Sequence, residues 1–186
     1  MKKFIILLRG VMPNGKNKVP MALLRDALGK VGLENVQTYI QSGNVIASSN
    51  RTQVDTEELV HSTISEKFGG NISVLARTPQ QFTSILECVP FKEVDTKKLY
   101  FTLLAKNPDK LLLKKFISID HSPDHIVYEN NVIYTLYNTK HSDSKFNNNY
   151  FERKLKVTMT SRNFNTMNKL VELANAQQEA QFGLRR

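Results

Sequence analysis

The sequence has little cysteine, no long hydrophobic run and almost no low-complexity sequence, and each absence excludes a class of protein. A single cysteine, Cys88, cannot form an intramolecular disulfide or a cysteine metal cluster, which is typical of a reducing compartment. No apolar segment approaches the roughly 20 residues that a membrane-spanning helix needs. The apolar run at residues 4–8 is shorter than the core of a signal peptide, and no small-residue cleavage site follows it. We therefore expect a cytoplasmic protein without a membrane partner.

What remains is the composition of an ordinary globular protein. The 186 residues are 40% hydrophobic and 23% charged, enough to bury a core without disulfides. With 26 Lys and Arg against 17 Asp and Glu, the net charge is +9, which permits weak binding to a phosphate backbone. Residues 1–92 contribute +4 of this charge and residues 93–186 contribute +5. The basicity is therefore not a detachable tail.

The first half of the chain alternates strand and helix patterns in the order β-α-β-β-α-β. Its strand-like segments are residues 2–8, 36–40, 45–47 and 72–76. Pro20 is expected at the first helical position of the first helix, and Gly32 just past its end. A capping box at Asp55 is expected to begin the second helix, which stops at Gly69. This order is that of a ferredoxin-like sandwich, and a short helix capped by Thr78 follows it.

The second half repeats this order with different residues. Its strand-like segments are residues 99–105, 126–128, 132–137 and 157–160. Asn130 and Asn131 lie between the middle two, where asparagine suits a tight turn with positive φ at both residues. A final long helix is expected from Phe164. The sequence therefore predicts an α+β protein of two ferredoxin-like halves with a C-terminal helix, divided into domains 1–92 and 93–186.

Two loops of the first half combine donors with glycine, and we predict that they bind an anionic ligand. The predicted ligand-binding residues are Arg9, Lys16, Asn17 and Lys18 in the strand-to-helix loop, and Gln41, Ser42 and Asn44 in the hairpin turn. Glycines allow backbone amides to approach a ligand, and a helix amino terminus adds free N–H groups. The loop is not a Walker motif, since Asn17 replaces the Ser or Thr that would hold magnesium. A solvated loop without a ligand is the competing interpretation.

A third candidate segment is the start of the last helix, with Ser161, Arg162 and Asn163 as predicted ligand-binding residues. Ser161 or Asn163 could instead cap the helix, which needs no ligand. Arg162 does not fit that role, because a cation at a helix amino terminus is slightly unfavourable. It indicates an anion nearby, either a ligand or a carboxylate of the protein itself.

Other catalytic and metal patterns are weak. His121 and His125 are four apart, but Pro123 between them disfavours a helix, so we predict a polar loop and no metal. No G-x-S-x-G motif is present, and we interpret Cys88 as a small buried hydrophobic residue. No RNA-recognition string is present either, and tyrosines are common in half-buried strands. We predict no cofactor.

Four stretches resemble the signature sequences of a bacterial family called domain of unknown function 1697. They are residues 7–10, 15–21, 38–45 and 161–166. The resemblance implies a small cytoplasmic α+β protein of two ferredoxin-like halves with no established activity, so no catalytic residue can be transferred. Where the family usually reads R-G-I-N-V-G-G-K, residues 9–16 read R-G-V-M-P-N-G-K, which loses one asparagine and one glycine. If relatives bind a ligand there, this loop binds it differently or not at all.

Three functions remain open on this sequence. The first is a module that binds a phosphate-bearing small molecule or nucleic acid through the three segments. The second is an enzyme acting on a small phosphorylated or carboxylated substrate, with lysine or arginine stabilising charge. The third is an interaction protein whose motifs serve folding and domain docking. The first is placed ahead because all three segments are polar, lie in loops and are rich in hydrogen-bond donors.

Overall fold

The computed structural model describes residues 1–12 and 14–183. Pro13, in the segment where the chain departs from the family pattern, lies outside the described residues. The chain divides into two compact units, Met1–Ser84 with Lys169–Arg186, and Ile85–Asn168. We call them unit 1 and unit 2. The division of the sequence at residue 92 stays a prediction.

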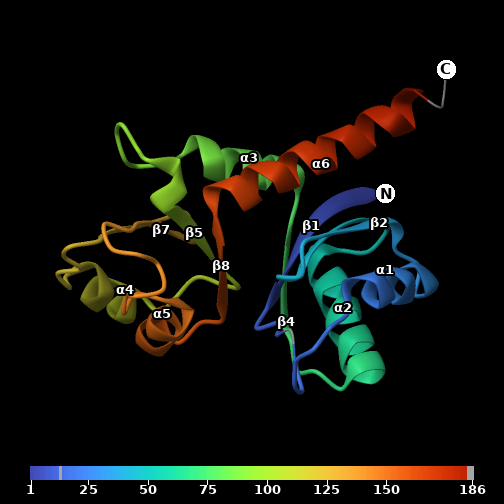
Figure 1. The fold of residues 1–186 in the computed structure, drawn as a ribbon, viewed down its shortest axis with the longest axis horizontal. Coiled ribbons are helices and arrows are strands. Elements are labelled where there is room, and N and C mark those ends of the chain that lie inside the picture. The colour runs from blue at the N-terminus through green and yellow to red at the C-terminus, as the bar shows by residue number, and fades with distance from the viewer. Residues whose placement is uncertain (13, 184–186) are drawn as a thin grey trace. The chain divides into compact units, whose positions relative to one another are not determined.

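Unit 1 is a four-stranded antiparallel sheet with two helices inserted between its strands (Figure 1). Its elements are β1 (Lys2–Arg9), α1 (Met21–Lys30), β2 (Glu34–Tyr39), β3 (Asn44–Ser49), α2 (Gln53–Phe68) and β4 (Ser73–Arg77). The strands lie in the order β2-β3-β1-β4. The helix α3 (Pro79–Glu87) follows, and the boundary between the units falls within it.

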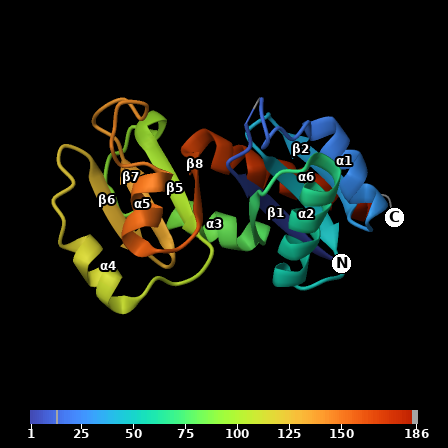
Figure 2. The ribbon, with the colours of Figure 1, turned by 90° about the horizontal axis from the view of Figure 1, so that it is seen from below.

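Unit 2 repeats the same topology. Its elements are a 3-10 turn (Thr96–Lys98), β5 (Leu99–Leu104), α4 (Lys110–Ile117), β6 (His125–Glu129), β7 (Val132–Leu136), α5 (Asn148–Leu155) and β8 (Met159–Asn163). The strands lie in the order β6-β7-β5-β8, as Figure 2 shows. The last helix is α6 (Phe164–Gly183). The prediction of an α+β fold with two ferredoxin-like halves and a C-terminal helix is confirmed.

The core of unit 1 lies between the sheet and the helices α1 and α2. On this face of β1 the alternate residues Phe4, Ile6 and Leu8 are buried, as are Leu24 of α1 and Val60 of α2. Each such side chain contributes about 1.5–3 kcal/mol through removal from water. The opposite face of β1 is also buried, and there Lys3 Nζ donates to the Ala174 carbonyl of α6 over 2.7 Å. The part of α6 in unit 1 therefore lies on the face that α1 and α2 leave open (Figure 1).

The core of unit 2 is rich in aromatic rings. Phe116 of α4 meets Phe151 of α5 edge to face, with ring centroids 5.8 Å apart. The Tyr137 hydroxyl donates to the Phe146 carbonyl over 2.5 Å, which ties the loop before α5 to the end of β7. The core therefore depends on a loop as well as on regular elements. Among the described residues, none of the helices has both the length and the hydropathy to cross a membrane.

The helix starts differ from the sequence predictions in two places. Pro20 is extended and lies before the first helical residue, Met21, rather than at the first helical position. The second helix begins at Gln53, because the Thr52 hydroxyl accepts from the Asp55 N–H over 3.2 Å. Asp55 is thus the third residue of the helix, and the prediction that a capping box at Asp55 begins the helix was wrong, because Thr52 is the cap.

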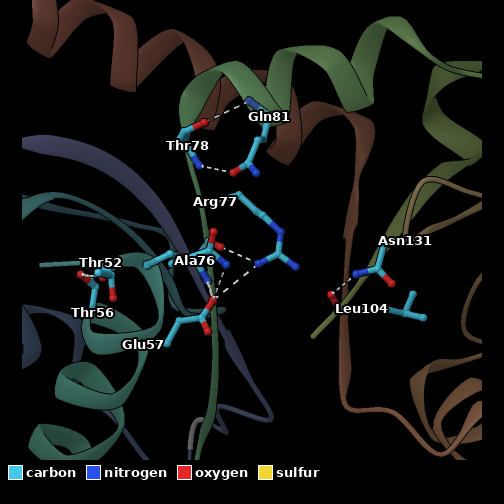
Figure 3. Close-up of polar contacts among 10 residues, drawn as sticks. Thr52, Thr56, Glu57, Ala76, Arg77, Thr78, Gln81, Leu104 and Asn131 are labelled. Carbon is cyan, nitrogen blue, oxygen red and sulfur yellow. Dashed lines mark hydrogen bonds and ion pairs between the residues drawn. The ribbon is translucent and has the colours of Figure 1, made fainter. Parts of the chain in front are cut away.

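The third helix begins as predicted. The Thr78 hydroxyl accepts from the Gln81 backbone N–H over 3.3 Å, while the side-chain Oε1 of Gln81 accepts from the Thr78 N–H over 2.8 Å (Figure 3). This reciprocal pair is a capping box. The helix ends before Cys88, which is exposed, so its interpretation as a buried residue was wrong.

Candidate functional site

Strand pairing brings two of the three predicted segments to one end of unit 1. Leu7 near the end of β1 is paired with Asn44 at the start of β3, and Arg9 is paired with Ser73 at the start of β4. Because these pairs are antiparallel, the loop after β1, the turn before β3 and the loop before β4 all leave the sheet at the same end. We call this end, made of residues 9–12, 14–20, 40–44 and 69–72, the loop end of unit 1.

The loop after β1 is folded on itself. The Met12 N–H donates to the Asn17 carbonyl over 3.0 Å, and the Lys18 N–H donates to the Gly15 carbonyl over 3.1 Å. A Cβ added to Gly10 would lie 3.9 Å from Asn17 Nδ2. A Cβ added to Gly70 would lie 3.7 Å from Asn17 Oδ1. The Asn17 amide therefore lies between two glycines of different loops, at the centre of the loop end.

The hairpin turn contacts the root of this loop. The Leu8 N–H donates to the Gly43 carbonyl over 2.8 Å. The Asn44 side chain is fully buried and donates to the Tyr39 carbonyl and to the Ser42 hydroxyl, each over 3.0 Å. These bonds give Asn44 a role in holding the turn. Gln41 and Ser42 are exposed at its tip.

The loop end carries positive charge without a compensating carboxylate in its own segments. Residues 9–20, 40–44 and 69–72 include Arg9, Lys16 and Lys18, and their sequence has no Asp, Glu, His or Cys. Lys16 and Lys18 are exposed and Arg9 is half-buried. The helix α1 starts here without a side-chain cap and without an acidic residue in its first turn. Its amino-terminal N–H groups add a partial positive charge, so the chemistry of the loop end suits an anion.

The third predicted segment belongs to unit 2 and is mostly strand. The predicted strand at residues 157–160 lies instead at 159–163, so Ser161 and Arg162 are within β8 rather than in a loop. The Ser161 hydroxyl bonds to the Thr102 hydroxyl and donates to Asn148 Oδ1 of α5 over 2.6 Å. It therefore faces the helix side of the sheet.

Arg162 is directed to the opposite face of the sheet and is 9% exposed. Its Nη1 donates to the Thr160 hydroxyl over 2.9 Å and to the Ser161 carbonyl over 2.8 Å. Asn163 Oδ1 accepts from the Thr166 N–H over 2.9 Å, which makes Asn163 the cap of α6. That this segment shares one site with the loop end of unit 1 stays a prediction.

Sequence reasoning missed a buried carboxylate in unit 2. Asp124 Oδ1 accepts from the Asn138 N–H over 2.8 Å and from the Thr139 N–H and hydroxyl, each over 3.3 Å. Its Oδ2 accepts from the Ser144 hydroxyl over 2.8 Å. Asp124 is 5% exposed, so these bonds replace water. No local sequence signal marks this role, because all the partners lie 14 to 20 residues away.

The two histidines that are four apart have different surroundings. His121 is buried between Phe116 and Phe146, with ring centroids 5.0 Å from each. Its Nε2 has no hydrogen-bond partner among the described residues. His125 is exposed at the start of β6. Within residues 1–12 and 14–183, no group of three or more His, Cys, Asp or Glu side chains could hold a metal ion.

Unfolding stability should decrease in mild acid because of His121. Burial lowers the pKa of His121 from its ordinary 6.5, with Lys145 and Lys154 acting in the same direction and Asp120 opposing them. The unfolded chain therefore binds the proton more tightly, and the unfolding free energy falls as pH falls below about 6.5. Burial also lowers the pKa of His141, which adds to the effect. Urea titrations at several pH values in this range measure the unfolding free energy, and its decrease with falling pH should be smaller for His121→Phe than for the unmodified chain. The same decrease in both proteins would contradict a role for His121.

The comparisons with known proteins agree with this fold. No curated protein matches the sequence. A solved structure of the conserved bacterial protein SP0830 from Streptococcus pneumoniae superposes with a TM-score of 0.73 at 22% identity, over 92% of this chain and 98% of that one. At this identity the likeness shows the fold alone. The model of a family described as protein of unknown function, DUF1697, matches residues 1–134. Three of the four stretches that resemble the family lie within this match, while residues 161–166 lie outside it, and the chain belongs to the DUF1697 family.

Proposed function

We propose that the protein binds a phosphate-bearing or other anionic ligand at the loop end of unit 1. The observation that carries the proposal is the convergence of Arg9, Lys16 and Lys18 on segments without any acidic residue. A small molecule with a phosphate group and the backbone of a nucleic acid share this chemistry. Charge-assisted hydrogen bonds from lysine and arginine to phosphate are among the strongest that a protein surface makes.

The backbone of the loop end supports the same function. Gly10 and Gly15 both have φ of +84°, a conformation that glycine adopts readily, and neither carries a side chain that would keep a ligand from the backbone. The uncapped start of α1 adds further donors. The competing enzymatic function has less support, because these segments lack the Asp, Glu, His and Cys side chains that serve as general acids, bases and nucleophiles.

Inorganic pyrophosphate and a single-stranded oligonucleotide are the two probes for this proposal. Isothermal titration calorimetry at low salt should detect binding of at least one of them. For the oligonucleotide, the logarithm of the affinity should fall with the logarithm of the salt concentration, with a slope of about −0.7 for each neutralised phosphate. Pyrophosphate binding alone would identify a small-molecule site. The absence of binding to both probes at low salt would overturn the proposal.

Removing two lysines of the loop end should weaken this binding about tenfold. Lys16→Ala with Lys18→Ala deletes two exposed ammonium groups, each worth about half to one kcal/mol of attraction to an exposed phosphate. The matched control is Lys2→Ala with Lys30→Ala, which removes the same charge from the start of β1 and the end of α1. Both positions are at the ends of these elements that lie away from the loop end. Equal losses for the two double variants would show that net charge alone attracts the probe, which contradicts a site at the loop end.

A further inference from the structure

The two sheets have four edge strands, and three of them are closed to a further strand by a specific contact. The edges are β2 and β4 in unit 1, and β6 and β8 in unit 2. An edge strand presents unpaired N–H and C=O groups that can pair with another chain, and proteins usually block them. How each edge is blocked therefore indicates where another strand can add.

In both β4 and β8, a glutamate from the helix that precedes the strand accepts a hydrogen bond from a backbone N–H group at the strand's outer edge. Glu57 Oε1 of α2 accepts from the Ala76 N–H over 2.7 Å, and the Arg77 guanidinium lies 3.5 Å from the same oxygen (Figure 3). Glu152 Oε1 of α5 accepts from the Met159 N–H over 3.1 Å in the same way. The two halves thus block the equivalent edge with the same device.

The edge of β2 is interrupted in two ways. Its pairing with β3 shifts register between Glu34 and Gln37, where Asn35 has φ of +52°. Such a bulge twists an edge away from regular pairing. Gln177 Nε2 of α6 also donates to the Asn35 carbonyl over 3.0 Å. An incoming strand would meet neither a regular backbone nor a free acceptor there.

The edge of β6 is regular and has none of these contacts. Residues His125–Glu129 pair with β7 in an unbroken register (Figure 2). In this fully described strand, no side chain bonds to an outward backbone group. A two-residue turn closes the hairpin on Glu129, and bonding residues alternate along an antiparallel strand. Counting back from Glu129, the N–H and C=O groups of Ile126 and Tyr128 are directed away from β7.

We propose that β6 pairs antiparallel with β6 of a second copy of this chain, about a two-fold axis at Val127. In this register Ile126 faces Tyr128 of the second copy, and the four outward N–H groups of the two strands each meet an outward carbonyl. Val127 faces its own counterpart at the closely spaced position. The four-stranded sheet of unit 2 in one copy and the same sheet in the second copy then become one continuous sheet of eight strands.

The charges of β6 favour a second copy over an unrelated peptide. The same register places His125 opposite Glu129 of the second copy, and both side chains are exposed. An imidazole N–H can donate to this carboxylate, and the two-fold axis produces the contact twice. The sequence of the strand is therefore complementary to itself when reversed. Because five residues bury far less than a standard interface, the dimer should be weak and depend on concentration.

Sedimentation velocity from micromolar to millimolar concentration tests the pairing. The unmodified chain should shift from monomer to dimer within this range. His125→Glu places two carboxylates opposite each other at both symmetric positions, and the dissociation constant should rise about tenfold. Glu129→Lys should also weaken the dimer. The double variant restores opposite charges at both positions and should return the dissociation constant to that of the unmodified chain.

The double variant also separates pairing from folding, because each substitution is at an exposed site and the rescue needs both strands. A chain that stays monomeric to millimolar concentration overturns the proposal. The proposal is also overturned if the dissociation constant of the dimer is the same for the single variants and the double variant, since the contact between the two copies would then lie on another face.

Discussion

Gly43→Ala is expected to lower the free energy of unfolding by about 3 kcal/mol. Gly43 has φ of +80°, which costs a residue with a Cβ about 1–2 kcal/mol. A Cβ at this position would lie 2.7 Å from Leu8 Cβ and 2.9 Å from Val11 Cγ2. Contacts this short force the turn away from β1 and add about 1–3 kcal/mol of overpacking. The Leu8 hydrogen bond to the Gly43 carbonyl would be strained as well.

Gly15→Ala is the matched control for Gly43→Ala. Gly15 has a similar φ of +84°, but no atom lies within 4 Å of an added Cβ. For Gly15→Ala the free energy of unfolding should therefore fall only by the cost of the positive φ, about 1–2 kcal/mol. Urea unfolding followed by circular dichroism measures both variants. Equal losses would show that the turn does not rest tightly on Leu8 and Val11.

The order of the elements could be predicted from the sequence because the signals are local. The Asn130 and Asn131 turn shows this, since the structure gives φ of +48° and +65° at the two residues. Asparagine tolerates that conformation, and the flanking strand patterns fix the hairpin. Thr78 similarly predicted a helix start from its own chemistry. In both cases the residue and its partners lie within a few positions of each other.

The strand β8 shows where local signals fail. Residues 161–163 are polar and lack the strand pattern, yet Ser161 and Arg162 pair with β5. Ser161 is accommodated by hydroxyl and amide partners from β5 and α5, which no spacing in its own segment reveals. Tertiary hydrogen bonds therefore override strand propensity here. The exposure of Cys88 has a different basis, because this residue lies just past the end of α3 at Glu87.

The candidate site shows an intermediate case. Arg9, Lys16 and Lys18 could be singled out from the sequence because they are close together and next to glycines. Their meeting with the hairpin turn required the register in which Leu7 pairs with Asn44. The sequence also could not separate Asn44, which holds the turn, from Gln41 at its exposed tip. Residue type identifies candidates, whereas burial and partners assign their roles.

Asp124→Ala is expected to destabilise unit 2 by about 3–5 kcal/mol. The substitution removes a buried carboxylate that accepts from the Asn138 and Thr139 N–H groups and from the Ser144 hydroxyl. A donor left without a partner in a buried site costs about 1–3 kcal/mol, and bonds to a charged acceptor are stronger than average. The same loop carries Phe146 into the core, so its loosening also weakens the packing around His121.

Asp124→Asn is the variant that separates lost hydrogen bonds from lost volume. Its amide oxygen can still accept from the Asn138 N–H, whereas its NH₂ group cannot accept from the Ser144 hydroxyl, so the loss should be about half that of alanine. Tyrosine fluorescence is a suitable probe, because five of the six tyrosines lie within Ile85–Asn168. Losses below about 1 kcal/mol for both variants would mean that water replaces the carboxylate without difficulty. Because the Asp124 partners join two loops to the end of β7, a large loss would instead identify this carboxylate as the main polar anchor of unit 2.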